Sequence, residues 1–164
     1  MKKIRIMGTM GSGKSYLGEK LSKRFNIDNY SLDDIFWKNK YSLYEESEVI
    51  EKRIEKILKK KFWIIEGVYG YRCNLRKTFK DADEIIWINP SIMVLICRLL
   101  KRYFQRMFAK DKVSKDSLIL IMGVIKHKLN MGSKSRRAYE DVSKKYKSKV
   151  IKIKNADIFL EGLK

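Results

Sequence analysis

The sequence has 164 residues, of which 45% are hydrophobic, so it can form one globular domain with a sizeable core, whereas two separate domains would each be small. Its formal net charge of +19 favours polyanionic partners, namely nucleotides, nucleic acid or an acidic surface, without choosing between them. The longest apolar runs, at 92–97 and 118–125, are far shorter than the roughly 20 residues of a membrane-spanning helix, so no membrane crossing is predicted.

Strand-like runs alternate with helical patterns along the chain, and with one proline and few glycines no linker divides it. This alternation predicts an α/β fold with a parallel sheet covered by helices, in one domain over 1–164. The predicted strands are 2–7, a short one within 26–37, 61–70 broken at Gly67, 83–90 ended by Pro90, and 147–154. The predicted helices begin near 13, cover about 44–60, 91–107 and 115–146, and end with 156–163, with an exposed loop at 109–116.

The two cysteines bear on the compartment. Cys73 and Cys97 are far apart and fit no metal-binding or redox spacing. A strand-like segment follows the first three residues, where a secreted protein would have a long apolar region. We therefore expect a reduced, cytoplasmic protein.

A phosphate-binding loop follows the first predicted strand. Gly8, Gly13, Lys14 and Ser15 occupy every fixed position of the pattern G-x-x-x-x-G-K-[ST]. The glycines, with Gly11, let the backbone approach the phosphates and point its N–H groups at them, and the following helix adds its N-terminal dipole. In this pattern the lysine reaches the β and γ phosphates and the serine hydroxyl ligates Mg²⁺. The sequence therefore predicts a nucleotide site at 8–15.

Acidic residues follow the second and third predicted strands, at the sheet edge where open α/β folds place their sites. Asp33 and Asp34 come just after the second strand, and Glu66 ends the third. Each can hold Mg²⁺ through water or orient an attacking hydroxyl. Asp34 is equally well explained as a helix N-cap or a solvated turn residue. Glu66 follows an apolar run and would be half buried without a partner.

Arginines follow the fourth predicted strand. Arg98, Arg102 and Arg106 are four residues apart and share one helix face. Such a face suits a ligand with negative charge, because arginine can stack on a base and bind phosphate, but a solvated basic face is the alternative. Arg136 and Arg137 are further candidates for phosphate contacts, at even odds with a surface role.

Several segments together resemble the P-loop kinase-like proteins related to adenylate kinase, and most closely the subgroup described as DNA topology modulation proteins (FlaR-related). The segments are the phosphate loop, "LDDIFW" at 32–37, "WIIEGVY" at 63–69, "DADEIIWINP" at 81–90 followed by "CRLLKR", and "VIKIKNADIFLEGL" at 150–163. The resemblance covers nearly the whole chain. It implies a three-layer fold with a five-stranded parallel sheet, an acceptor-binding arm at about 35–60 and a lid at about 105–117.

The resemblance also implies which residues bind the nucleotide. In such kinases an R-x-x-x-R helix places one arginine against the adenine and one on the phosphates, which corresponds to Arg98 and Arg102. The turn after the fifth strand, Lys154, Asn155 and Ala156, corresponds to an adenine-contacting segment. The implied nucleotide site comprises these residues and Gly8, Met10, Gly11, Ser12, Gly13, Lys14, Ser15 and Tyr16. One departure matters: "IEGVYGYR" stands where true adenylate kinases have "DGFPR", which does not favour AMP as the acceptor.

The sequence thus predicts an ATP- and Mg²⁺-dependent phosphotransferase acting on a small-molecule acceptor. The predicted catalytic residues are Lys14, Asp33, Glu66 and Arg102, with Asp33 orienting the acceptor, and the predicted metal ligands are Ser15, Asp33 and Glu66. The alternative is an ATP-binding protein that associates with nucleic acid and modulates DNA topology. That role needs a clustered basic face, whereas lysine is spread along almost the whole chain.

Overall fold

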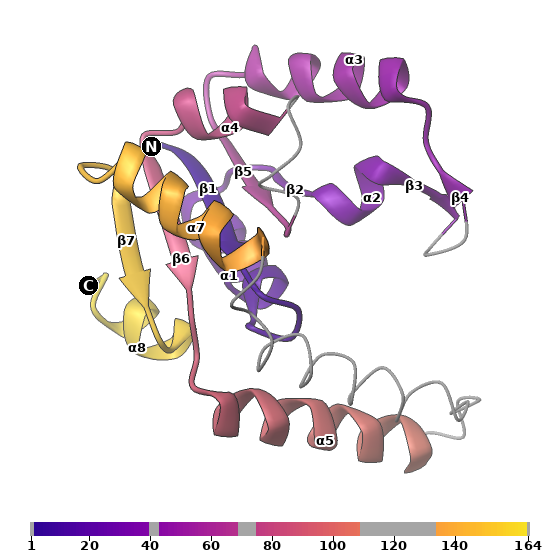
Figure 1. Cartoon of the computed structure of the whole chain (residues 1–164), viewed down its shortest axis with the longest axis vertical. Helices are drawn as coiled ribbons and strands as arrows, with labels where there is room; N and C mark the ends of the chain where they lie inside the picture. The colour runs from indigo at the N-terminus through magenta and orange to yellow at the C-terminus, as the bar shows by residue number, and fades with distance from the viewer. Residues whose placement is uncertain (1, 40–42, 69–74, 109–133, 164) are drawn as a thin grey trace.

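The computed structural model describes residues 2–39, 43–68, 75–108 and 134–163. Five strands form one parallel sheet in the order β2-β5-β1-β6-β7, with β1 at its centre (Figure 1). Their bounds are β1 Lys3–Gly8, β2 Asn29–Ser31, β5 Trp63–Glu66, β6 Glu84–Ile88 and β7 Val150–Ile153. The predicted five-stranded parallel sheet is therefore confirmed.

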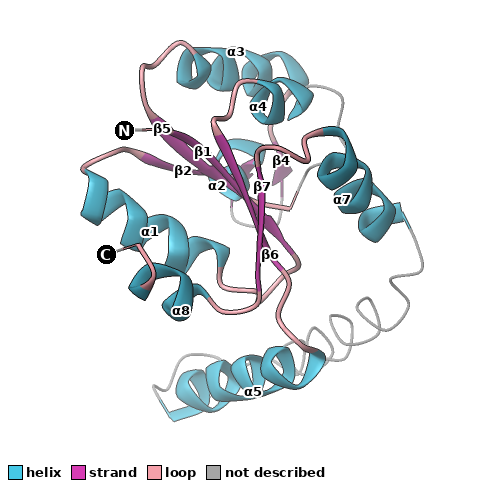
Figure 2. Cartoon of the chain, turned by 90° about the vertical axis from the view of Figure 1, so that its left-hand side faces the viewer, coloured by secondary structure: helices cyan, strands magenta, loops and turns pink. Residues whose placement is uncertain are grey.

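Helices cover both faces of this sheet, which gives three layers (Figure 2). The helices α1 (Lys14–Phe25) and α8 (Ala156–Glu161) lie on one face, and α3 (Ser47–Leu58), α4 (Arg76–Lys80) and α7 (Lys134–Lys145) lie on the other. The long helix α5 (Ile92–Phe108) leaves the end of β6 and extends beyond the sheet (Figure 1). Within the described residues, no helix is both long enough and apolar enough to span a membrane.

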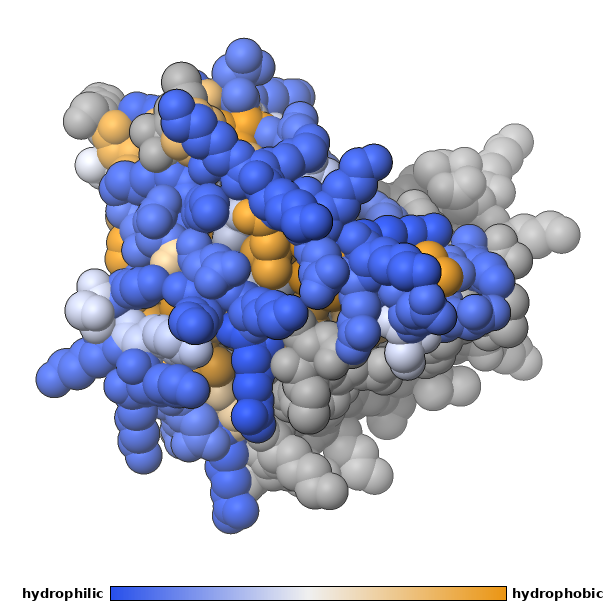
Figure 3. Space-filling model, turned by 90° about the horizontal axis from the view of Figure 1, so that it is seen from above, coloured by the Kyte–Doolittle hydropathy of each residue, from blue (hydrophilic) through white to orange (hydrophobic). Residues whose placement is uncertain are grey.

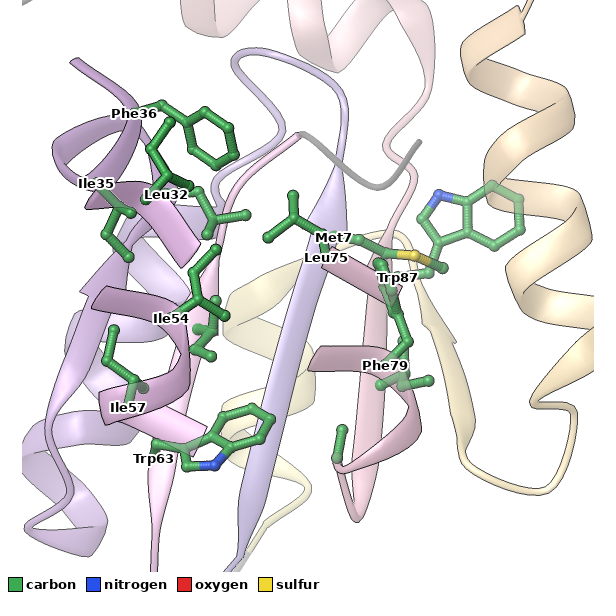
Figure 4. Close-up of a cluster of buried hydrophobic side chains, with 14 of the residues drawn as sticks. Met7, Leu32, Ile35, Phe36, Ile54, Ile57, Trp63, Leu75, Phe79 and Trp87 are labelled. Carbon is green, nitrogen blue, oxygen red and sulfur yellow. The ribbon is translucent and has the colours of Figure 1, made fainter. Parts of the chain in front are cut away.

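The strands are buried on both faces because their side chains alternate between two hydrophobic clusters. Ile4 and Ile6 of β1 join the cluster beneath α1 and α8. Met7 and, from β5, Trp63 join the larger cluster beneath α3, α4 and α7, which Figure 4 shows. Helix α3 completes this cluster with Ile50, Ile54 and Ile57, which recur at helical spacing along one buried stripe.

The face seen from above is mainly hydrophilic, with small apolar patches between the polar side chains (Figure 3). Besides the five-residue helix α4, two short elements of the structure were not predicted. A two-stranded hairpin, β3 (Trp37–Asn39) and β4 (Leu43–Tyr44), precedes α3. A five-residue helix, α2 (Leu32–Phe36), begins directly after β2. The acidic pair predicted to follow the second strand therefore lies in a helix.

Several predicted segments extend beyond the described residues. The exposed loop at 109–116, and with it most of the lid at about 105–117, lies outside them. So does the first part of the long helical region at 115–146, of which α7 is the described end. The predicted arm at about 35–60 is described except for 40–42, and it consists of the end of α2, the hairpin and α3.

Candidate active site

The phosphate loop forms the turn between β1 and α1. Gly13, the N-cap of α1, has φ of 99°, a left-handed conformation that favours glycine. A Cβ on Gly8 would lie 2.5 Å from the carbonyl oxygen of Ile88 on β6. There is therefore no space for a side chain at the point where the loop follows β1. The predicted strand, loop and helix arrangement is confirmed.

Lys14 is the first residue of α1 and is buried, with 8% of its surface exposed. Its Nζ donates a hydrogen bond to the carbonyl oxygen of Thr9, at 2.9 Å. Burial lowers its pKa to about 8, and this effect outweighs the opposite influence of the Glu66 and Asp33 carboxylates. The loop thus holds one ammonium group inside it, facing two acids.

Glu66 and Ser15 meet at the carboxyl end of the sheet. Glu66 ends β5, beside Ile6 of β1 in the sheet register, and only 3% of its surface is exposed. The Ser15 Oγ donates a hydrogen bond to Glu66 Oε1, at 3.0 Å. Glu66 is therefore fully buried and has a partner, where the sequence predicted a half-buried side chain without one.

Asp33 and Asp34 lie in the first turn of α2. The N-cap of this helix is Ser31, so the interpretation of Asp34 as the N-cap is wrong, because the helix already begins at Leu32, one residue before the acidic pair. Ser31 pairs with Glu66 in the sheet register, which places the start of α2 next to the end of β5. Both aspartates thus reach the edge where Glu66 lies.

A cavity of about 550 Å³ opens between these elements. It adjoins the phosphate loop, since Ser15 is part of its wall. Its volume falls within the range that small-molecule sites occupy. The lining residues come from α1, β2, α2, β3 and β5, and they are Ser15, Glu19, Asn29, Ser31, Asp33, Asp34, Trp37, Lys38 and Glu66.

The oxygens around Ser15 suit a hard divalent cation. The Ser15 hydroxyl and a Glu66 carboxylate oxygen are 3.0 Å apart, and Asp33 lines the same cavity. Among the described residues, no three acidic, cysteine or histidine side chains are grouped closely enough to hold a metal ion by themselves. This agrees with the usual Mg²⁺ site at a phosphate loop, which uses few protein ligands and completes its shell with phosphate and water.

Helix α5 brings its first arginine to the phosphate loop. Arg98 Nη1 donates a hydrogen bond to the carbonyl oxygen of Ser12, at 2.8 Å. Leu99 of the same helix is buried, and a Cβ on Gly11 would lie 3.3 Å from its side chain. The guanidinium predicted to bind nucleotide thus contacts the loop itself.

The other predicted arginines give less information. The side chains of Arg102 and Arg106 on α5, and of Arg136 on α7, lie outside the described part of the structure. Arg137 of α7 is exposed. The structure therefore does not test whether these four side chains bind phosphate.

The predicted adenine segment lies beside the first turn of α1. Tyr16 Oη donates a hydrogen bond to the Asp157 carboxylate, at 2.7 Å, and the Asn155 side chain accepts one from the Asp157 N–H as the N-cap of α8. Ala156 is buried, and Lys154 is exposed. Met10 and Tyr16 both expose nearly half of their surface at the phosphate loop. The turn between β7 and α8 is thus joined to the helix that follows the loop.

Sequence reasoning missed Arg5, which lies beneath the site on β1 with none of its surface exposed. Its guanidinium donates hydrogen bonds of 3.2 Å to the carbonyl oxygens of Ile65 and Gly67 and lies over the Phe79 ring, 4.9 Å from the centroid. Burial lowers its pKa to about 10, against the opposing effects of Tyr139 and Glu66. In the sequence, the buried role of Arg5 is indicated by a charged residue inside an otherwise apolar strand.

Tyr139 of α7 is the second residue that was missed. It is buried, and its Oη lies 3.2 Å from the carbonyl oxygens of both Gly8 and Val68. Its ring packs against Trp87, with the centroids 6.1 Å apart. One hydroxyl therefore connects α7 to the start of the phosphate loop and to the turn after β5.

We expect Tyr139→Phe to destabilise the fold by about 1 kcal/mol, since it removes this hydroxyl and keeps the ring. The affinity for ATP should fall with it, because Gly8 loses its link to α7. Urea unfolding and titration with a fluorescent ATP analogue measure the two effects. Tyr146→Phe is the matched control, since Tyr146 is half-buried directly after this helix and its hydroxyl forms no hydrogen bond among the described residues. Equal midpoints for the two variants would contradict the assignment.

Comparisons with known proteins agree with this architecture. No model of a protein family matches the sequence. The chain is 36% identical over 107 residues to the uncharacterized protein YqaC of Bacillus subtilis (strain 168), a match that covers 64% of this chain and 58% of the relative. It is 28% identical over 129 residues to shikimate kinase of Sulfurihydrogenibium sp. (strain YO3AOP1), which covers 70% of this chain and 76% of that protein. The chain thus spans little more than half the length of the first relative.

Solved structures give the fold directly. Shikimate kinase from Acinetobacter baumannii in complex with shikimate superposes with a TM-score of 0.56 over 99% of this chain and 93% of its own, at 14% identity. A gluconokinase from Sinorhizobium meliloti 1021 superposes with a TM-score of 0.55 over 92% and 81%, at 15% identity. The chain has the fold of the P-loop kinases, with a phosphate loop between the central strand and the first helix.

Proposed function

We propose that this protein is an ATP- and Mg²⁺-dependent phosphotransferase that acts on the hydroxyl group of a small molecule. The observation that carries the proposal is the cavity beside the phosphate loop, because Ser15 belongs to both and donates a hydrogen bond to Glu66 in the cavity wall. A phosphate donor held by the loop would face an acceptor held in the cavity. The identity to a shikimate kinase and the fold shared with a gluconokinase support the same class of reaction.

The nucleotide would be held mainly by the backbone. The N–H groups of the loop 8–13 and the N-terminus of α1 would bind the β and γ phosphates, and the Lys14 ammonium would leave the Thr9 carbonyl to neutralise them. Arg98 would contact the nucleotide, and its hydrogen bond to the Ser12 carbonyl oxygen of the loop supports this role. The adenine would lie against the turn 154–156, and Arg102 would bind phosphate in the manner that the resemblance implies.

Mg²⁺ would be held by the Ser15 hydroxyl, with Glu66 and Asp33 binding it directly or through water. Its chemistry is to neutralise the β and γ phosphate oxygens. The hydrogen bond between Ser15 and Glu66 holds both oxygens together beside the phosphate loop, where the cation would bind. The acidic donor set of the cavity suits such a cation.

The chain contributes positioning and charge to the transfer step. The acceptor hydroxyl oxygen forms a bond to the γ phosphorus while the bond from that phosphorus to the β,γ-bridging oxygen breaks, which releases ADP. Asp33 would orient the hydroxyl and receive its proton. Lys14 would stabilise the charge that moves onto the leaving ADP.

Release of ADP in the presence of acceptors tests this function. We expect purified protein with ATP and Mg²⁺ to release ADP slowly, and at least about tenfold faster with the right acceptor, because positioning an acceptor replaces a slow reaction with water. A coupled assay over nucleosides, nucleotides, sugars and polyols measures it. Omission of Mg²⁺ is the control. Failure to bind ATP, or the same ADP release with every acceptor as without, would contradict the proposal.

A second function, association with nucleic acid in the manner of a DNA topology modulation protein, is favoured by one observation, the net charge of +19. Binding that neutralises several DNA phosphates should weaken by on the order of 10³-fold between 50 and 200 mM salt. ATP in a recessed loop should lose much less affinity. We expect DNA binding to be negligible near physiological salt, in titrations of labelled duplex and labelled ATP analogue. Tight DNA binding that survives this salt and responds to ATP would favour the second function.

A further inference from the structure

The cavity beside the phosphate loop is strongly acidic in a strongly basic protein. Its lining contains four carboxylates, those of Glu19, Asp33, Asp34 and Glu66, and one cation, Lys38. The formal charge of the lining is therefore −3, from four negative charges and one positive. Over the whole chain, 38 lysines and arginines outnumber 19 acidic residues, so an acidic wall is the reverse of what the composition predicts.

These carboxylates form no ion pairs among the described residues, although the buried Arg5 and Lys14 act on Glu66 electrostatically. Glu66, almost fully buried, accepts a hydrogen bond at Oε1 from a neutral hydroxyl, and its Oε2 has no hydrogen bond from any described residue. The ammonium of Lys14 interacts electrostatically with Glu66 and Asp33, but its hydrogen bond goes to the Thr9 carbonyl.

The one cation of the lining is itself engaged elsewhere. Lys38 Nζ lies 3.6 Å from Glu45 Oε1, and Arg53 lies 3.5 Å from the other oxygen of the same carboxylate. Glu45 is buried beside the cavity and does not line it. Lys38 thus balances Glu45. Since Glu66 and Asp33 are assigned to Mg²⁺, the carboxylates of Glu19 and Asp34 are left for the acceptor.

From these observations we infer that the phosphoryl acceptor is a hydroxyl compound that carries a protonated amine, such as an amino sugar or an amino alcohol, and no carboxylate or phosphate. This inference rests on the proposed phosphotransferase function. An anionic acceptor would meet unpaired carboxylates and the negative charge of MgATP together. A cationic acceptor would pair with the carboxylates, and the Trp37 ring in the wall adds a surface that attracts cations.

A second metal ion is a weaker explanation of the same charge. No three of the acidic side chains converge on one point that could hold a metal, among the residues that the structure describes. They are distributed over α1, α2 and β5 around a space of about 550 Å³. Carboxylates spread in this way suit an extended organic cation with several hydrogen-bonding groups.

The charge of the cavity can be measured without any turnover. Trp37 lines the cavity, whereas Trp63 and Trp87 are buried, so collisional quenching of tryptophan fluorescence reports on Trp37. We expect Cs⁺ to quench at least twofold better than I⁻, each relative to free N-acetyltryptophanamide, since a potential of one kT changes the local concentration of a monovalent ion roughly 2.7-fold. Trp37→Phe should remove this quenching. Preferential quenching by I⁻, as the net charge of +19 alone predicts, would overturn the inference.

Acceptors matched in size then test selectivity. Glucosamine, glucose and glucuronate share one ring and differ in charge, as do ethanolamine, ethylene glycol and glycolate. In each series that supports ADP release, we expect kcat/KM to be at least about tenfold higher for the amine than for the carboxylate. The double variant Glu19→Gln/Asp34→Asn should reduce this preference. Glu51→Gln, an exposed carboxylate on α3, should leave it unchanged.

The two experiments separate the inference from the function on which it rests. ADP release that is fastest with glucuronate, glycolate or a nucleotide would keep the phosphotransferase and overturn the cationic acceptor. If Cs⁺ quenches preferentially but the protein neither binds ATP nor releases ADP, the cavity binds cations and the proposed phosphotransferase function is wrong.

Discussion

Lys14→Ala should reduce phosphoryl transfer by on the order of 10²–10³-fold, which is typical for the loss of one group that stabilises transition-state charge. Lys14 is the one cation inside the phosphate loop, and it faces both Glu66 and Asp33. The fold should remain intact, because a buried lysine whose pKa is lowered to about 8 by desolvation is not a stabilising group. Initial rates of ADP release and the melting temperature measure the two effects.

The control for this variant is Lys23→Ala on the same helix. Lys23 is exposed in the last turn of α1, so its loss removes the same charge at a distance from the loop. It should retain the wild-type rate. A Lys14→Ala protein with the wild-type rate would show that the loop does not hold the transferred phosphate.

The pKa of Lys14 adds a readout that distinguishes charge from structure. Below about pH 8 the free protein carries the ammonium, and above this value it loses the proton. The affinity of the wild type for ATP should therefore fall as the pH rises from about 8 towards 10, and that of Lys14→Ala should stay constant over this range. Titration of a fluorescent ATP analogue at a series of pH values measures this dependence.

The sheet could be predicted because its strands are buried on both faces. A short, wholly apolar run such as Trp63 to Ile65 is typical of a central parallel strand. Glycine and proline indicate where such strands end. The hairpin β3 and β4 was missed because strands of three and two residues are too short to show alternation. Helix α2 was missed because five residues cannot establish a helical period.

The candidate site could be predicted where its chemistry is local. A phosphate loop needs particular residue types within eight consecutive positions, so the segment from Gly8 to Ser15 can be recognised from the sequence alone. The contacts that position the loop come from distant parts of the chain: Arg98 is 86 residues from Ser12, and Tyr139 is 131 residues from Gly8. Nothing near either residue in the sequence indicates these partners. The charge of the cavity is equally hard to predict from the sequence, because three separate segments, α1, α2 and β5, contribute its carboxylates.

Gly8→Ala should destabilise the fold by about 1–3 kcal/mol, because the added methyl group has no space. Its Cβ would lie 2.5 Å from the Ile88 carbonyl oxygen and 2.8 Å from Ser12 Oγ. The Ile88 oxygen belongs to the backbone of β6, which pairs with β1 at this residue. It can withdraw only if the end of the sheet opens, and the movement would also disturb the carbonyl of Gly8 that Tyr139 binds.

Gly162→Ala provides the matched comparison, since it makes the same chemical change at the C-cap of α8. Gly162 has φ of −71°, and the nearest atoms to an added Cβ are 3.6 Å away. Its free energy of unfolding should stay within about 0.5 kcal/mol of the wild type. Urea unfolding of both variants, with ATP-analogue titration of each, tests whether the gap between β1 and β6 requires glycine. If Gly8→Ala unfolds and binds like Gly162→Ala, the close approach of Gly8 to Ile88 does not govern the shape of the phosphate loop.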